Sequence, residues 1–284
     1  MHEKKRKSQV EKSFRGGDLL KVSLSIEAEK FADWMGLLRR VNDIITPLGI
    51  DQEKIYTTII DSDHISMLRF IAEKNAFKKF NVVGSWELGI DTEEIQKMLT
   101  EKFQIKNIVG TLDIDFNDPE LELTLKLPKQ KTKRHFYFTD LSTIHDPEYY
   151  IIPDLLFTAK VILEASVFKS IVQDCYKVSD NFSLWIGKNI QKLCVTAHYE
   201  KSLSYLAEIQ DIIEIESEGE AKGNYNLSFI VDILPYLHNQ ITIHLGVDIC
   251  MRIDFTLWGA QCSYIIAPRV MRDQKNEIAR EVIV

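Results

Sequence analysis

The pattern of apolar and polar residues repeats along the chain at an offset of 137 residues. FADWMGLLRRVND, from Phe31, and FKSIVQDCYKVSD, from Phe168, superpose with apolar residues at the i, i+4 and i+7 positions of one helix face. Strand-like runs flank both segments on both sides, at 19–26, 54–61, 156–163 and 192–199. Because the flanks match as well as the helices, we interpret the chain as a duplication of one structural unit.

Each half contains a second, shorter helical pattern. In the first half it covers 91–104, and Asp91 is the expected N-cap because its carboxylate can accept from free backbone N–H groups. In the second half it covers 228–240, where Pro235 predicts that the helix ends early. The rest alternates apolar and polar residues with short connections, which predicts antiparallel strands. The expected fold is α+β, with two similar domains that each pack two helices on an antiparallel sheet.

Composition divides the chain into five segments. The first is basic and nearly free of apolar residues, which predicts a disordered tail, and its KKRK run also fits a nuclear address or a nucleic-acid contact. TDLSTIHDPEYYIIPD has the loop-forming residues of an extended connector. The expected boundaries are a tail at 1–18, domains at 19–135 and 154–270, a connecting loop at 136–153 and a C-terminal tail at 271–284.

Bulk composition narrows the class of protein. The 284 residues, 45% hydrophobic and 27% charged, leave room for two globular domains. No apolar run reaches the roughly 18 residues of a membrane span. Four cysteines without a CxxC pair predict reduced thiols and no zinc finger. The net charge of −7 excludes a protein that is basic over its whole surface, but a local basic face stays possible because salt screens charges beyond about 8–10 Å.

Basic side chains lie off the apolar faces of the predicted helices. Acids such as Asp33, Glu94, Glu101 and Asp174 share these faces. A plain solvated surface and a surface for a polyanion therefore both remain open at this point. The basic residues concerned are Lys30, Arg39, Arg40, Lys97, Lys102, Lys169 and Lys177.

Enzymatic chemistry finds little support. DIDFND, from Asp113, begins like a calcium loop but lacks the required later Gly and Glu. Phosphate-loop, metalloprotease and serine-hydrolase motifs are absent. Asp61, Asp63 and His64, in IIDSDHISMLRF, form the one cluster that a metal-dependent hydrolase could use. We favour a plain turn there and expect no enzymatic activity, no metal and no cofactor.

Four local signatures together resemble the proliferating cell nuclear antigen (PCNA) family of DNA sliding clamps, in its archaeal form. They are DSDHIS (61–66), DLLFTAKVIL (154–163), LPYLHNQITIHLGVDICMRIDF (234–255) and YIIAPRV (264–270). The resemblance covers about residues 19–270. It implies that three subunits join head to tail in a six-domain ring, with helices around a hole for duplex DNA and sheets outside.

The resemblance also implies roles for particular residues. The seven basic helix residues would face DNA. The groove for partner proteins would be bordered by Ile60, His64, Ile65, Met67, Leu141, Ile144, Ile265, Ala267 and Pro268. The subunit edges would be the strands near 120–127 and 202–209, with Leu121, Leu123, Leu125, Leu203, Tyr205 and Leu206.

The sequence departs from the family pattern at three places. Ile265 stands where an aromatic residue is usual, Cys250 where a proline is usual, and the last helix carries Pro235 and lacks the usual basic residue. A checkpoint-type or heterotrimer-specific clamp subunit is therefore the alternative to a replicative clamp. The implied partners are duplex DNA without sequence preference, identical or paralogous subunits, and DNA polymerase, clamp loader, ligase and nuclease bound through short apolar peptides. The implied location is inside the cell, with the chromosome and not at a membrane.

Overall fold

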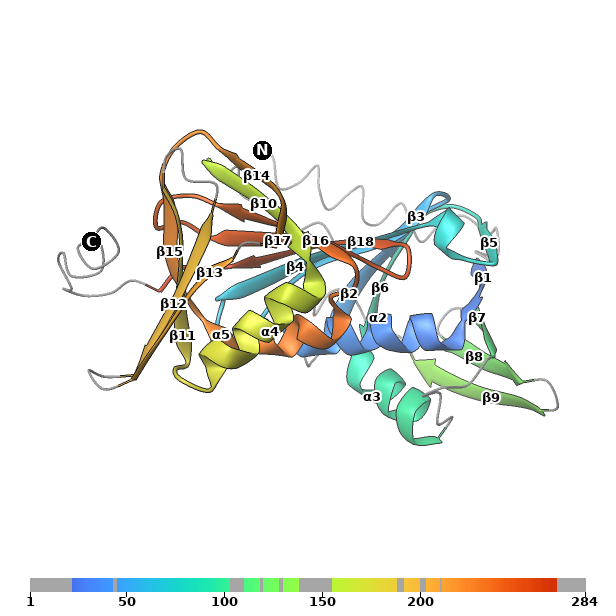
Figure 1. Cartoon of the computed structure of the whole chain (residues 1–284). Helices are drawn as coiled ribbons and strands as arrows, with labels where there is room; N and C mark the ends of the chain where they lie inside the picture. Colours follow the sequence, from blue (N-terminus) through green and yellow to red (C-terminus); the bar gives the residue numbers. More distant parts are fainter. Residues whose placement is uncertain are drawn as a thin grey trace, which may run out of the picture.

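In the computed structural model of the chain, the residues described are 22–42, 45–102, 110–117, 120–127, 130–137, 155–187, 192–199, 203–209 and 211–269. Their elements form two halves with the same order: a strand, a helix, five strands, a helix and three strands (Figure 1). The predicted duplication is therefore confirmed, and it extends to every strand of the two halves. Leu141 and Ile144, two of the expected groove residues, lie outside the described residues.

The first half runs from β1 to β9. Its elements are β1 (Val22–Glu27), α2 (Ala28–Val41), β2 (Ile45–Ile50), β3 (Lys54–Ile60), β4 (Ser66–Glu73), the 3-10 turn η1 (Lys74–Ala76), β5 (Lys79–Val82), β6 (Trp86–Asp91), α3 (Thr92–Lys97), the π-helical turn η2 (Met98–Lys102), β7 (Thr111–Asn117), β8 (Glu120–Leu127) and β9 (Gln130–Tyr137). Strand β9 thus includes two residues that the sequence assigned to the connecting loop.

The second half repeats this order. Its elements are β10 (Ala159–Glu164), α4 (Ala165–Tyr176), β11 (Asn181–Ile186), β12 (Leu193–Tyr199), β13 (Leu203–Ile209), β14 (Ile212–Ser217), β15 (Ala221–Asn226), α5 (Leu227–Ile233), the 3-10 turn η4 (Leu234–Tyr236), β16 (Gln240–Leu245), β17 (Met251–Leu257) and β18 (Ala260–Ile266).

One sheet joins the two halves. It has nine strands in the order β14-β10-β16-β17-β18-β4-β3-β2-β6, and the antiparallel pair β18–β4 is the junction between the halves. The first half also forms a five-stranded sheet, β5-β1-β7-β8-β9, and the second a four-stranded one, β13-β12-β11-β15. Each half therefore contributes equivalent five-stranded and four-stranded sets, and only one set of each half takes part in the junction.

As a result, the counterparts of the two junction strands are terminal strands of their sheets. Among the described residues, β9, the counterpart of β18, pairs only with β8, and β13, the counterpart of β4, pairs only with β12. The expectation that β13 is an edge is confirmed. The expectation that β8 is an edge, with Leu121, Leu123 and Leu125, is wrong, because β7 and β9 pair with it on both sides. Leu123 and Leu125 are instead 0% and 2% exposed in the core.

Two predicted helix boundaries are confirmed, the N-cap at Asp91 and the early stop before Pro235, whereas the helix expected over 91–104 ends as an α-helix at Lys97 and continues as η2 to Lys102. Asp91 accepts a hydrogen bond from the backbone N–H of Glu94 at 2.8 Å, as an N-cap does. Asn226 caps α5 in the same way, through the N–H of Ser228. Pro235 lies in η4, directly after α5 ends at Ile233, because a proline cannot supply the next helical hydrogen bond.

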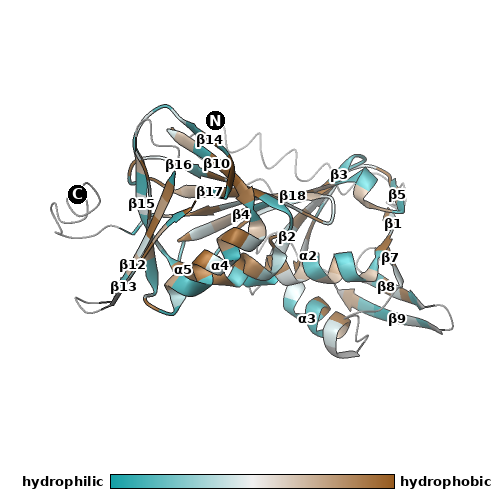
Figure 2. Ribbon diagram, in the orientation of Figure 1, coloured by the Kyte–Doolittle hydropathy of each residue, from teal (hydrophilic) through white to brown (hydrophobic). Residues whose placement is uncertain are grey.

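The four α-helices of the described residues lie on one side of the sheets and bury their apolar faces against one continuous core (Figures 1 and 2). α2 packs against α3 of its own half and α5 of the other. Gly36 permits the close approach of α2 to η4, the turn after α5, since a Cβ atom there would lie 2.6 Å from the Tyr236 hydroxyl oxygen. Within the described ranges, no helix is long and apolar enough to cross a membrane.

Candidate nucleic-acid and partner interfaces

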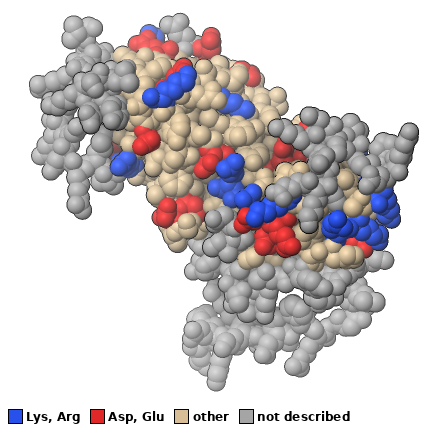
Figure 3. Space-filling model, turned by 90° about the horizontal axis from the view of Figure 1, so that it is seen from below, with Lys and Arg blue, Asp and Glu red and all other residues tan. Residues whose placement is uncertain are grey.

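The solvent side of the four helices, which we call the helix surface, carries the predicted basic residues. Lys30, Arg39 and Arg40 lie on α2, Lys97 on α3 and Lys169 on α4. Lys177 follows α4 as its C-cap, and Lys102 lies in η2, with its side chain outside the description. On this side, clusters of lysines and arginines lie next to acidic residues (Figure 3). The structure thus brings the basic residues to one side of the molecule, but it also intersperses acids among them.

Most of these cations are already neutralised within the chain. Arg40 lies 3.5 Å from Asp232 of α5, Lys30 lies 3.3 Å from Glu27, and Lys177 lies 2.8 Å from Asp174. For Lys169, no ion pair is found among the described residues, and burial lowers the pKa of its amine. The free chain therefore presents a surface on which positive and negative charges nearly balance. The spacing of basic residues in the sequence alone did not decide whether this surface would be basic.

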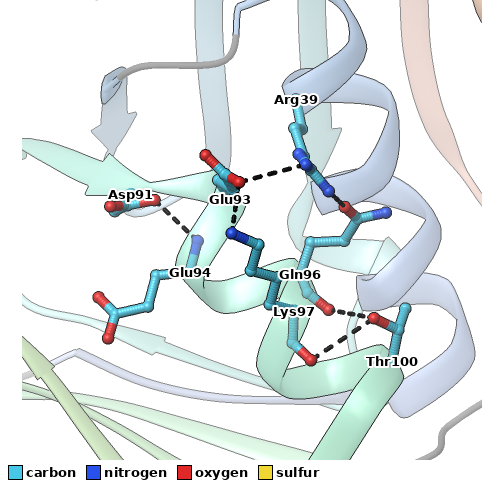
Figure 4. Close-up of polar contacts among 7 residues, drawn as sticks. All are labelled: Arg39, Asp91, Glu93, Glu94, Gln96, Lys97 and Thr100. Carbon is cyan, nitrogen blue, oxygen red and sulfur yellow. Dashed lines mark hydrogen bonds and ion pairs between the residues drawn. The ribbon is translucent and has the colours of Figure 1, made fainter.

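Arg39 and Lys97 share one acid, Glu93 of α3 (Figure 4). The carboxylate oxygen Oε1 lies 2.6 Å from Nζ of Lys97 and 3.3 Å from Nη2 of Arg39. Arg39 also donates from Nη1 to Gln96 at 2.5 Å. The hydrogen bond from Lys97, with the charges of Lys97 and Arg39, holds the pKa of Glu93 below its usual value, so the carboxylate is ionised at neutral pH. This cluster fixes two cations close together on the helix surface.

The Asp61–Ser66 segment is a capped turn. Asp61 is only 8% exposed, and its carboxylate accepts from the N–H groups of Asp63 at 2.7 Å, Ile65 at 3.1 Å and Ser66. His64 has a φ of 58° and is exposed. Since backbone donors occupy the carboxylate, it is not available as the ligand or base that the hydrolase alternative needs, and the interpretation as a turn is confirmed.

Three of the predicted groove residues form a continuous row on the outer face of the nine-stranded sheet. Ile60 of β3 pairs with Met67 of β4, and Met67 pairs with Ile265 of β18. Ala267 donates its N–H to the carbonyl of Ile65 at 2.8 Å, which holds the segment containing Pro268 against the capped turn. The predicted groove residues that the structure describes therefore do lie together.

The same row continues into polar residues that the sequence interpretation missed. Ile265 pairs with Arg252, Arg252 with His244 and His244 with Lys160. We call these six residues, Ile60, Met67, Ile265, Arg252, His244 and Lys160, the outer row. In the sequence, Arg252, His244 and Lys160 occupy polar positions of strands that alternate apolar and polar residues, but no motif marked them.

Arg252 and His244 belong to a compact polar group. His244 Nε2 lies 2.9 Å from Asp254 Oδ2 and 3.0 Å from Nη2 of Arg252, whose guanidinium lies 5.1 Å from the centre of the Phe157 ring. Burial raises the pKa of Asp254, but hydrogen bonds from His244 and Ser263 and the charge of Arg252 outweigh it, so the pKa is lowered overall. The outer row is thus apolar at one end and polar at the other.

The side chains along the open edges of β9 and β13 differ in polarity and exposure from those at the β18–β4 junction inside the chain. On β9, Arg134 pairs with Leu123 of β8, so its side chain is on the core side of the sheet, although it is exposed. On β13, Tyr205 is half-buried and Leu206 is 60% exposed, while the side chain of Leu203 lies outside the description. Asp174 of α4 is close enough to Tyr205 to help raise the pKa of its hydroxyl, after burial and Cys175.

Comparisons with known proteins were made at the level of both sequence and structure. No protein-family model matches the chain. It is 25% identical over 251 residues to the DNA polymerase sliding clamp of Thermococcus fumicolans, covering 86% of this chain and 96% of the relative. It superposes with a TM-score of 0.78 on Archaeoglobus fulgidus PCNA bound to the C-terminal region of FEN-1, at 19% identity over 89% of this chain and 100% of that one. For the PCNA2–PCNA3 complex of Sulfolobus tokodaii the TM-score is 0.73, at 18% identity over 87% of this chain and 99% of that one.

Proposed function

We propose that this chain, a distant homologue of the archaeal sliding clamps with the same fold, is a subunit of a ring that encircles duplex DNA and tethers replication and repair enzymes. The single observation that carries the proposal is the pair of open edges. The two halves are joined by β18 and β4, and the equivalent strands β9 and β13 each keep one edge without a partner among the described residues, so the arrangement extends naturally to a second copy.

The junction inside the chain supplies a template for the junction between chains. The β8–β9 hairpin corresponds to β17–β18, and the β12–β13 pair corresponds to β3–β4. Superposing these equivalent pairs places β9 of one copy beside β13 of the next. In this register Lys131 lies opposite Glu208, and Arg134 lies opposite Tyr205. Pairing of this kind also removes two exposed sheet edges, which otherwise invite aggregation. Three copies then close a ring of six similar halves.

In this ring the helix surface lines the hole and meets the phosphates of duplex DNA. Contacts of arginine and lysine to phosphate carry no base information, so the ring binds without sequence preference and slides. Lys30, Arg39, Arg40, Lys97, Lys102, Lys169 and Lys177 remain the candidates for these contacts. Such a ring works inside the cell, on the chromosome.

The outer row and the capped turn form the docking site for partner enzymes. The apolar end, with Ile60, Met67 and Ile265, suits the anchor side chains of a short peptide. The solved complex of A. fulgidus PCNA with the C-terminal region of FEN-1 supports this class of partner. DNA polymerase, clamp loader and ligase are further candidates for the same site.

A second candidate is a clamp subunit specific for a heteromeric ring. The S. tokodaii PCNA2–PCNA3 complex shows that a similar chain assembles with a paralogue. The near-neutral helix surface favours this candidate, because other subunits of such a ring could supply more basic residues. Native mass of the purified chain, alone and with co-expressed paralogues, separates the two candidates.

The test of the clamp function is topological. The protein is incubated at high concentration with nicked circular DNA, diluted into moderate salt and separated from free protein by gel filtration. A ring stays on the circle and runs off after one restriction cut. The triple change Arg39→Glu, Arg40→Glu and Lys97→Glu is expected to reduce retention while native mass stays unchanged. Equal retention on circular and linear DNA would contradict encirclement.

A further inference from the structure

The Glu93 cluster has the geometry of an occupied anion site. One carboxylate oxygen contacts two cations from different helices, Lys97 of α3 and Arg39 of α2 (Figure 4). The side chains of Arg39 and Lys97 are 36% and 54% exposed, so both are also within reach of a ligand from solvent. An oxygen shared between a guanidinium and an ammonium group is the arrangement in which proteins hold a phosphate oxygen.

The neighbouring carboxylate does not share this arrangement. Glu94 is the next residue of α3 and is exposed on the same helix. Its backbone N–H binds Asp91, but its side chain has no partner among the described residues. The two glutamates therefore differ in one property, the bridging of two cations, while their charge and their position in the helix are alike.

We propose that Glu93 occupies the place of a DNA phosphate between Arg39 and Lys97, so that duplex DNA contacts these two cations only by displacing an internal carboxylate. This inference rests on the proposed function, and it adds an internal contact that lowers the affinity of the ring for DNA. A phosphate that enters this cluster must first separate Glu93 from its two cations. The net gain per contact is therefore smaller than for free cations, which favours a ring that slides over one that stalls.

The displacement leaves the cluster electrostatically balanced. Gln96 keeps its hydrogen bond to Arg39, so the guanidinium stays oriented when Glu93 withdraws. The freed carboxylate points to solvent, since Glu93 is itself 38% exposed. A protein whose formal net charge is −7 would gain two accessible cations at one point if this acid were neutralised.

The experiment compares Glu93→Gln with Glu94→Gln. Both remove one negative charge from α3, but only the first frees Arg39 and Lys97. A fluorescent linear duplex is titrated with each variant and with the unchanged protein, and anisotropy gives the affinity between about 50 and 200 mM salt. For Glu93→Gln we expect affinity to rise at least about fivefold above Glu94→Gln at the lowest salt, with a salt slope steeper by about 1–2.

Two further variants secure the interpretation. Adding Arg39→Gln and Lys97→Gln to Glu93→Gln is expected to abolish the gain in affinity. Glu93→Ala is expected to give the same gain, because the gain comes from the loss of the carboxylate and not from the new glutamine side chain. Equal affinities and slopes for Glu93→Gln and Glu94→Gln would overturn the proposal. The clamp function is judged separately, by retention of the unchanged protein on circular DNA, so either idea can fail while the other stands.

Discussion

The ring junction of this chain is expected to depend on a charged pair, Arg134 of one copy and Asp174 of the next. By the matched hairpins Arg134 takes the place of Tyr264, and by the offset of 137 residues Asp174 takes the place of Leu37. Inside the chain, Tyr264 and Leu37 are 1% and 0% exposed beside the β18–β4 pair. Two buried, uncharged positions beside one junction thus correspond to opposite charges at the other.

The size of the effect on association depends on how deeply Arg134 and Asp174 are buried when two copies join. Truncating one partner of a charge pair buried at an interface costs about 2–5 kcal/mol, mostly because the other charge is left unpaired. Asp174 retains Lys177 at 2.8 Å, so the lower figure applies. About 2 kcal/mol per junction corresponds to a roughly 30-fold weaker association for Arg134→Gln. Higher salt is expected to weaken the unchanged ring in the same direction, but less.

Sedimentation velocity over a dilution series measures the effect. Lys133→Gln is the matched control, since Lys133 is the preceding residue of β9 and faces the other side of the sheet, where it contacts Glu122 at 2.8 Å. It is expected to change association less than about threefold, as exposed pairs do. The combination of Arg134→Glu with Asp174→Arg is expected to restore assembly that each change alone destroys. If Arg134→Gln assembles like the control, or if the combination is no better than the single changes, the proposed register of β9 against β13 is wrong.

Three further outcomes are expected. Met67→Ala is expected to weaken binding of a FEN-1 C-terminal peptide in calorimetry, without change in native mass, because Met67 lies between Ile60 and Ile265 in the outer row; unchanged binding would place the docking site elsewhere. Ile265→Tyr is expected to strengthen the same binding about fivefold, which is about 1 kcal/mol for roughly 40 Å² of added apolar contact. Asp61→Ala is expected to lower stability by about 1–3 kcal/mol in urea melts, since it leaves the buried N–H of Ser66 and two partly buried backbone donors without their acceptor, whereas Asp63→Ala should change it little.

Local physics explains what the sequence could predict. The Asp91 cap, the early stop at Pro235 and the helix periodicity all depend on residues within one or two turns, and each is found in the structure. The duplication was visible because its two copies are ordered alike along the chain. The capped turn at Asp61 was also predictable, since its hydrogen bonds join residues at most five positions apart.

Pairings over long distances in sequence explain the rest. Nothing in the sequence joins Arg39 to Glu93, because that contact depends on how α2 packs on α3. The choice of β8 as an edge failed for a similar reason: its alternating leucines fit a sheet strand, but alternation does not tell an edge from a centre. Arg252 and His244 were missed because the row containing them crosses six strands.

The continuity of the nine-stranded sheet bears on how long such a ring lasts. β18 and β4 belong to one chain, so each strand always has its partner nearby and dilution cannot separate the two. In the proposed ring only the β9–β13 contacts are intermolecular, and their rate of dissociation sets the time that a closed ring stays on circular DNA. A covalent link between two copies across β9 and β13 would leave two such contacts instead of three. Because any one contact can open the ring, its lifetime on DNA would lengthen in inverse proportion to the number of contacts that remain, while its fold and its docking surface would stay the same.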